Sequence, residues 1–409
     1  MDGLVFGWDF CKDYSQIIAF HLKKMVAEPI HIAANESDLI PSVIAKKKDS
    51  TDWKIGEEAC RLSEESETVF IQDLFNHENT EEYLAIFIKK IHNHLKEKFP
   101  DEEFRCLTIA LPSLKPVWIG HIRKILEDLD WKKEKIHFIS RSECYFYYLL
   151  NKKKELWNDY AALFDLSDSG FHYYELKINR SAKPQTANIY YEKLDDGFNP
   201  KILDTSAGGK LADQILCGCA ERLMQKKSYS SILLTGKGFV HSEWAVNFIK
   251  LAGSHKRLYY APDVLAEGAA LKAYEYVAEG KLHPYVLLCE GTLSTTISLK
   301  AEVNGTEKQV AFALAGDHWH DLTNTLILLV NASPSIDFYL SQNHLKQVQK
   351  LSIPLKNLPE RPKKTTKIEV QITFINENTM QVKIRDLGFG ELFPASFMEI
   401  QKEICFQPT

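Results

Sequence analysis

A marked excess of either charge is missing from this sequence. Its 409 residues include 50 Lys and Arg against 55 Asp and Glu, so the formal net charge is −5. Domains that bind nucleic acid or anionic membrane surfaces usually carry a clear basic excess. We therefore expect neither nucleic acid nor a membrane among the partners of this protein.

Long apolar runs are missing as well. No stretch approaches the ~18 uninterrupted apolar residues that a membrane-spanning helix needs. The N-terminus, Met1-Asp2-Gly3-Leu4, lacks the basic start and the apolar core of a signal peptide. With no export signal, the eight scattered cysteines are expected to stay reduced, so we predict a cytoplasmic protein.

Several familiar catalytic and metal-binding motifs are also absent. The sequence contains no Gly-Lys-Thr phosphate loop, no paired Cys-x-x-Cys motif and no Gly-x-Ser-x-Gly nucleophile turn. His318 and His320 have the spacing that puts two side chains on one face of a strand. Two ligands without a second cluster favour ordinary surface residues over a metal site. These absences exclude the commonest hydrolase and zinc-site patterns.

The overall composition is ordinary for a globular protein, and the predicted secondary structure divides the chain into two parts. Hydrophobic residues make up 45% and charged residues 26%, and the length predicts two or three domains. Strand and helix patterns alternate up to about Tyr285, whereas short strands separated by turns follow it. We therefore predict an α/β domain over 1–285, with halves of about 1–157 and 158–285, and a small antiparallel β domain over 286–409.

Two hairpins with an aspartate at the bend mark the two halves of the α/β domain. In the first, the strand Leu4–Phe10 contains Asp9 near its end, and the chain returns along Ile17–Phe20. In the second, Asp165 stands at the end of a strand, and the chain returns along Phe171–Ile178. Facing acidic tips form a cleft in which Mg²⁺, held by one or two carboxylates, can bind phosphates. The preference of aspartate for turns would explain each of these residues by itself. Because both occur at the same place in matching hairpins, we favour the cleft.

These hairpins belong to a series of motifs whose order resembles the actin/DnaK/sugar-kinase superfamily. Among its members, the DnaK-type (seventy-kilodalton heat-shock) chaperones are the most similar. In the α/β domain the resemblance rests on Gly7–Phe10, Ile55–Ala59, Thr108–Pro112, Ile139–Cys144, Phe164–Gly170, Asp204–Gly209, Ile232–Gly238 and Glu267–Ala270. In the β domain it rests on Val286–Ser294, Lys367–Phe374 and Met380–Gly390.

The resemblance implies a fold, a nucleotide and a set of residues. The fold is a duplicated actin-like (ribonuclease H-like) ATPase core, followed by a β-sandwich like a chaperone peptide-binding domain without its lid. ATP and Mg²⁺ are expected between the lobes, with Asp9 and Asp165 near the metal. Ile139–Cys144 is similar to the family pattern iNEPtAA, which assigns a catalytic role to Glu143 beside the two aspartates. Nucleotide contacts are assigned to Lys12, Ser167, Ser169, Gly170, Gly208, Gly209, Gly236, Lys237 and Gly238.

Several departures from the family pattern weaken the expectation of hydrolysis. Both phosphate loops are altered, since 11–14 replace small residues in the first and 167–169 replace glycines in the second. The segment 68–74 lacks the catalytic lysine of the family. Only one helix and a short loop separate Gly209 from Ile232, where the family inserts a subdomain that covers the adenine. Because less ligand surface can be buried, nucleotide affinity should fall.

Two functions fit these observations. The first is a divergent DnaK-like protein that binds ATP and Mg²⁺ between its lobes, is at best a weak ATPase, and binds a polypeptide on its β domain. The second is a pseudo-ATPase scaffold that no longer binds nucleotide and uses the cleft or the β domain for a protein partner. A sugar or acid kinase of the same superfamily is a weaker alternative, because the β domain has no role there.

Overall fold

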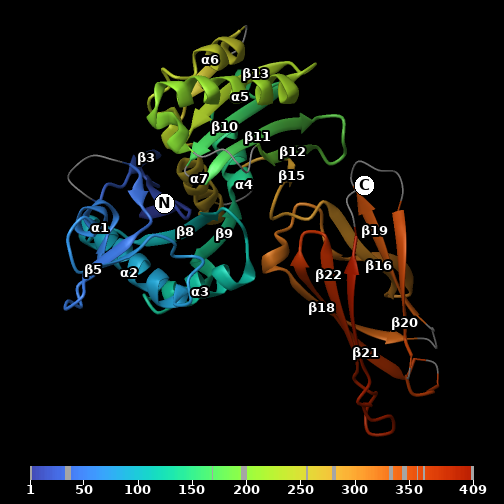
Figure 1. Cartoon of the computed structure of the whole chain (residues 1–409). Coiled ribbons are helices and arrows are strands. Elements are labelled where there is room, and N and C mark those ends of the chain that lie inside the picture. Colours follow the sequence, from blue (N-terminus) through green and yellow to red (C-terminus); the bar gives the residue numbers. More distant parts are fainter. Residues whose placement is uncertain are drawn as a thin grey trace. The chain divides into compact units, whose positions relative to one another are not determined.

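The computed structural model (Figure 1) divides into two compact units. The first comprises residues 1–178 and 189–284, and the second comprises residues 179–188 and 285–409. Within the described residues, no helix is long and apolar enough to cross a membrane. The structure describes residues 2–32, 38–167, 169–194, 200–254, 257–278, 282–330, 335–342, 348–356, 358–362 and 364–406.

The first half of the first unit is an assembly of strands covered by helices. Its elements are β1 (Leu4–Phe10), β2 (Tyr14–His21), β3 (Val26–Pro29), β4 (Ile40–Pro41), β5 (Ile44–Lys47), β6 (Lys54–Ile55), α1 (Gly56–Ser63), β7 (Thr68–Ile71), α2 (Thr80–Lys98), β8 (Phe104–Leu111), α3 (Pro116–Glu127), β9 (Ile136–Ser140) and α4 (Arg141–Leu150). The main sheet has the order β3-β2-β1-β8-β9, with β4 paired to β2, and a smaller sheet has the order β6-β5-β7. β1 is antiparallel to β2 and parallel to β8, which is parallel to β9.

The second half repeats this arrangement with a second sheet. Its elements are β10 (Tyr160–Ser167), β11 (Gly170–Asn179), β12 (Thr186–Lys193), α5 (Ser206–Met224), β13 (Tyr229–Thr235), α6 (Val246–Gly253), β14 (Arg257–Tyr260) and α7 (Val264–Val277). The order β14-β13-β10-β11-β12 is the order of the first sheet read from the other edge. β10 is antiparallel to β11 and parallel to β13, as β1 is to β2 and β8. The predicted α/β fold is therefore confirmed.

Small residues bring helix α7 very close to strand β1 and helix α4. A Cβ atom on Gly7 would lie 2.1 Å from the backbone nitrogen of Ala270, and one on Gly268 would lie 1.9 Å from the carbonyl oxygen of Cys144. Real Cβ atoms do not approach other atoms so closely, so only glycine permits this packing. Figure 1 shows α4 and α7 side by side in this unit.

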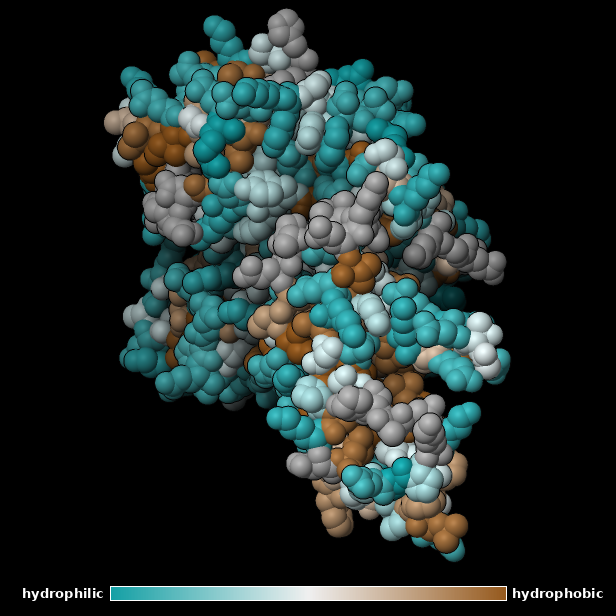
Figure 2. Space-filling model, turned by 90° about the vertical axis from the view of Figure 1, so that its right-hand side faces the viewer, coloured by the Kyte–Doolittle hydropathy of each residue, from teal (hydrophilic) through white to brown (hydrophobic). Residues whose placement is uncertain are grey.

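The second unit consists of two antiparallel sheets. Its elements are β15 (Val286–Leu288), β16 (Thr295–Val303), β17 (Thr306–Ala313), β18 (Thr323–Val330), β19 (Ser335–Gln342), β20 (Val348–Pro354), β21 (Thr366–Asn376), β22 (Thr379–Asp386) and β23 (Glu399–Cys405). The four-stranded sheets have the orders β17-β16-β19-β20 and β18-β21-β22-β23. β15 pairs in parallel with Thr186–Asn188, the part of β12 that belongs to this second unit. In Figure 2, hydrophobic residues (brown) lie among hydrophilic ones in the lowest part of the view, which belongs to this unit.

Candidate functional site

The two aspartates predicted at the hairpins occupy matching places in the two sheets. Asp9 is paired with Gln16 across the β1–β2 ladder, and Asp165 is paired with His172 across the β10–β11 ladder. Both aspartates lie near the carboxyl ends of strands that also pair in parallel with a neighbour, β8 and β13 respectively. Ligand sites of α/β proteins commonly form at such strand ends. Both side chains are almost completely buried, with 1% and 0% exposure.

Arg141 joins the two aspartates. It is the first residue of α4, which starts directly after β9 at the same edge of the sheet as Asp9. Its Nε and Nη2 donate to Asp9 Oδ1 and Oδ2 at 2.9 and 2.7 Å, and its Nη1 donates to Asp165 Oδ2 at 3.1 Å. The arginine side chain is only 5% exposed. A buried guanidinium therefore holds the acids of the two halves together, with the two-point geometry of strong Arg–carboxylate pairs at Asp9.

Two residues of the altered first loop complete the surroundings of the guanidinium. Arg141 Nη2 lies 3.0 Å from the hydroxyl oxygen of Tyr14 and 3.2 Å from the sulfur of Cys11. The Cys11 thiol in turn lies 3.1 Å from the backbone oxygen of Tyr14, to which it donates. Burial raises the pKa of both the Cys11 thiol and the Tyr14 hydroxyl. Both groups are therefore neutral partners of a charged arginine.

The charges in this cluster do not cancel, because one guanidinium faces two carboxylates. Burial works against the charged form of Arg141, but Asp9 and the neighbouring groups outweigh it and raise the pKa of the guanidinium. Burial, together with the charges of Asp9 and Asp13, raises the pKa of Asp165 from 3.8 to about 6, although Arg141 opposes this rise. Asp165 Oδ1 is buried and has no hydrogen-bond partner among the described residues. Asp9 is thus the principal counterion of Arg141, and Asp165 is the weaker one.

His172 is a neutral neighbour of the same cluster. Burial and the positive charges of Arg141 and Lys193 lower its pKa to about 3. Its Nδ1 lies 3.0 Å from the hydroxyl oxygen of Tyr191. An uncharged imidazole adds no positive charge to the site, so Arg141 remains the cation that faces both aspartates.

The polar residues expected to contact phosphate have protein partners. Lys12 Nζ lies 2.9 Å from Asp73 Oδ2. Ser169 Oγ lies 2.7 Å from Ser167 Oγ and 3.4 Å from His172 Nε2. Gly170 begins β11, opposite Ser167 in the hairpin, and Asp168 lies outside the described residues. The lysine and the serines therefore contribute to internal contacts.

The four glycines predicted to contact nucleotide are closely packed against protein atoms. Gly236 has a φ of +89°, a conformation that favours glycine. The nearest neighbours of a Cβ atom would be Ile202 O for Gly208 (1.8 Å), Trp244 Cβ for Gly209 (3.1 Å), Leu166 O and Asp165 Oδ1 for Gly236 (2.3 and 2.6 Å), and Leu166 Cγ for Gly238 (2.4 Å). Packing within the second half therefore accounts for glycine at these positions. Lys237 begins a short 3-10 helix, Lys237–Phe239, and its charge acts on the Cys60 thiol of α1.

Glu143 lies in a different polar cluster from the two aspartates. Its Oε1 is 3.4 Å from Lys272 Nζ of α7. Lys272 Nζ also lies 3.0 Å from Glu275 Oε2 and donates to the Tyr147 hydroxyl at 2.9 Å. This second cluster joins α4 to α7. Together the two clusters attach α4 to both halves of the unit.

Sequence analysis did not identify Arg141, although it lies two positions before Glu143 in the segment that is similar to iNEPtAA. When iNEPtAA is laid on Ile139–Cys144 without a gap, its glutamate falls on Arg141, and Glu143 falls two positions later. A positive residue at the place of an expected carboxylate was the available signal. What the sequence could not show is that this side chain reaches both Asp9 and Asp165.

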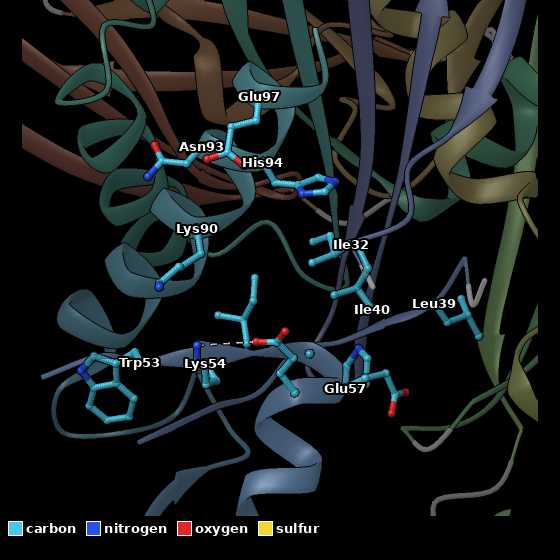
Figure 3. A pocket seen from close by; sticks show the side chains of 14 residues that line it. Ile32, Leu39, Ile40, Trp53, Lys54, Glu57, Lys90, Asn93, His94 and Glu97 are labelled. Carbon is cyan, nitrogen blue, oxygen red and sulfur yellow. Dashed lines mark ion pairs between the residues drawn. The ribbon is translucent and has the colours of Figure 1, made fainter. Parts of the chain in front are cut away.

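A separate cavity of about 300 Å³ lies in the first half, away from the acid pair. Figure 3 shows Lys90, Asn93 and His94 of α2 on one side of it and Trp53 and Lys54 on another. The ammonium groups of both lysines are already within 3.1 Å of the carboxylate of Asp52. Ile32 and Leu39 are also part of its lining.

Comparison with known proteins gives family matches without an activity. The model of a family of unknown function (DUF5716), C-terminal, matches residues 28–290. The model of a domain of unknown function (DUF8552) matches residues 292–406. No curated protein matches the chain. Among solved structures, the pCBH ParM non-polymerisable quadruple mutant shares 13% identity at a TM-score of 0.42, covering 66% of this chain and 99% of that chain.

Proposed function

Because this chain belongs to the family of unknown function DUF5716 (C-terminal), we propose its function from its own residues. We propose that it is a pseudo-ATPase scaffold. In this proposal the first unit keeps the duplicated core of the actin-like superfamily but does not bind Mg²⁺ and ATP. Its acid pair holds Arg141 instead, and the second unit binds a polypeptide partner.

The observation that supports this proposal is the buried ion-pair cluster of Asp9, Arg141 and Asp165. A magnesium site between the halves would need the oxygens of these two carboxylates as direct or water-mediated ligands. Three of those four oxygens accept hydrogen bonds from the guanidinium. A divalent cation placed there would also meet the positive charge of Arg141 at short range. The residues present therefore do not fit Mg²⁺, and we assign no hydrolytic step to this cluster.

The cluster offers a structural replacement for a nucleotide. In a two-lobed ATPase, a bound cation and phosphate can join acidic groups of the two lobes. Here Arg141 makes that connection. Because the arginine is part of the chain itself, the connection does not depend on the concentration of any ligand. The two halves should consequently stay joined in a single arrangement, which suits a scaffold better than a nucleotide-driven switch.

The proposed partner site lies in the second unit, where we take the two sheets to form the predicted β-sandwich. A groove of about 590 Å³ lies between the ends of β16, β18 and β19. Leu299, Leu328 and Ile336 contribute apolar lining, and Lys300 and Asp337 contribute charges. An extended polypeptide fits such a groove, because apolar pockets accept its alternate side chains.

Thermal unfolding with and without ATP and Mg²⁺ tests the first part of the proposal. A ligand at 100 times its dissociation constant stabilises a protein by about 2.7 kcal/mol, which is a readily measured shift. We expect no Mg²⁺-dependent shift at millimolar ATP. A shift in the wild type that disappears in both Asp9→Ala and Asp165→Ala would establish a working nucleotide cleft and refute the scaffold proposal.

Peptide binding tests the second part. Fluorescence anisotropy with labelled, extended apolar peptides should show saturable binding to the full chain. Ala301→Asp, which adds a charge to the groove lining outside β18, should weaken that binding, whereas Arg222→Met in the first unit should leave it unchanged. Equal binding by both variants would remove the groove as the partner site.

A further inference from the structure

Strand β18 forms an unusual edge in the second unit. It lies at the end of the sheet β18-β21-β22-β23, paired with β21 along its whole length. No strand is paired with its other side within the described part of the chain. Its sequence, Thr-Asn-Thr-Leu-Ile-Leu-Leu-Val, contains no charged residue and ends in five consecutive apolar ones. Ile327 and Leu329 are 58% and 53% exposed.

The other three edge strands of these two sheets carry protection that β18 lacks. Charged side chains and proline on an edge strand discourage pairing with another chain, because an exposed edge offers unpaired N–H and C=O groups. The protective residues are Glu307 and Lys308 on β17, Lys350 and Pro354 on β20, and Glu399, Lys402 and Glu403 on β23. The absence of such residues on β18 therefore singles out this edge for strand pairing.

We propose that β18 pairs with β18 of a second copy of this chain, antiparallel about a two-fold axis. Along a strand, alternate residues turn their backbone groups to the same side, so self-pairing joins residues of the same parity. When the two-fold axis passes between the two Leu328 residues, Leu326 of each copy faces Val330 of the other copy, and Ile327 of each copy faces Leu329 of the other. Every facing pair is then apolar, and the interface is closed because both copies use the same patch.

Charge selects a second copy as the occupant of this edge. Self-pairing of β17, β20 or β23 brings like charges together in every register that places a charged residue on the two-fold axis, and like charges that face each other destabilise a strand pair. β18 is the edge on which an identical strand meets no charge at all. A strand from another protein would need a matching apolar run, whereas a second copy of this chain supplies one by symmetry.

The dimer should be weak and should depend on concentration. One pair of short strands buries less than the roughly 1,200 Å² of surface that specific, stable interfaces bury. Pairing covers the outer faces of Ile327 and Leu329, which are the exposed apolar side chains of the strand. The proposal does not depend on the Arg141 cluster, which lies in the other unit.

Sedimentation velocity of the full chain over a wide concentration range tests this dimer. The wild type should show a weight-average sedimentation coefficient that rises with concentration. Ile327→Lys and Leu329→Glu should each weaken dimerisation about tenfold or more, because each change occurs twice in a two-fold interface. The double variant should regain dimerisation, since the introduced lysine of one copy then faces the introduced glutamate of the other.

Ile375→Lys is the matched control, because Ile375 is also exposed (42%) but lies on β21, away from the open edge. Circular dichroism of each variant verifies that the fold is retained. A wild type that remains monomeric at the highest concentration overturns the proposal, and binding of an apolar peptide at β18 in that case assigns the edge to another protein. Equal effects of Ile327→Lys and Ile375→Lys, or no recovery in the double variant, also overturn it.

Discussion

Replacement of Arg141 by methionine is the most direct measure of what the buried arginine contributes. Methionine keeps much of the length and apolar volume of the side chain but removes the charge and all the hydrogen-bond donors. The carboxylates of Asp9 and Asp165, which are 1% and 0% exposed, would then face each other without a counterion. Removing one partner of a buried ion pair typically costs about 3–5 kcal/mol of unfolding free energy.

This loss is large enough to follow by thermal or urea unfolding. For a unit of this size, about 1 kcal/mol corresponds to about 2 °C in the melting temperature, so Arg141→Met should lower it by about 6–10 °C. Arg222→Met is the control, because the Arg222–Glu192 pair is exposed at the arginine (56%) and such pairs contribute about 0–1 kcal/mol.

A triple variant separates lost charge pairing from lost packing. Asp9→Asn, Arg141→Met and Asp165→Asn together remove every charge of this cluster, so most of the lost stability should return. If Arg141→Met costs no more stability than Arg222→Met, or if the triple variant is less stable than Arg141→Met alone, the cluster does not hold the two halves together.

Three further results are expected. In the folded chain Asp165 keeps its proton up to about pH 6, against 3.8 for an ordinary aspartate, so its contribution to the unfolding free energy is fully present below pH 3.8 and is lost as the pH rises through about 6. The wild type should therefore lose about 3 kcal/mol of unfolding free energy, measured by urea unfolding, between pH 4 and 7, and Asp165→Asn should remove this loss. The same pH dependence in both proteins would contradict this expectation. Gly268→Ala should destabilise the chain by several kcal/mol, because its Cβ would meet the backbone of α4. Gly120→Ala is the control: its Cβ would meet no atom within 4 Å, so it should stabilise the chain by about 0.5–1 kcal/mol. Similar melting temperatures for the two variants would refute the close helix contact. With a thiol reagent at pH 8, the exposed Cys405 should react rapidly, whereas Cys11 should react only on unfolding, because it is buried and burial raises the pKa of its thiol. Mass spectrometry of labelled peptides gives the order of reaction. Early labelling of Cys11 would show that the cluster is open to solvent.

Local sequence patterns were sufficient to predict the two hairpins and their aspartates. Each hairpin is a short apolar strand, a polar turn and a second apolar strand, and these signals all lie within about 20 residues. The same local reading predicted the change from alternating strands and helices to short strands near Tyr285. It did not predict which residues would surround the aspartates, because those residues come from elements far along the chain.

The sequence by itself thus determined the α/β halves, the place of Asp9 and Asp165 in each, and the altered loops beside them, since periodicity and turn chemistry act between near neighbours. Only the tertiary structure decided what the aspartates bind. Arg141 is 132 residues from Asp9 and 24 from Asp165, and it reaches both because parallel strands bring β1 and the start of α4 to one edge of the sheet. Burial then makes the contact obligatory, because carboxylates removed from water require a positive partner or a proton.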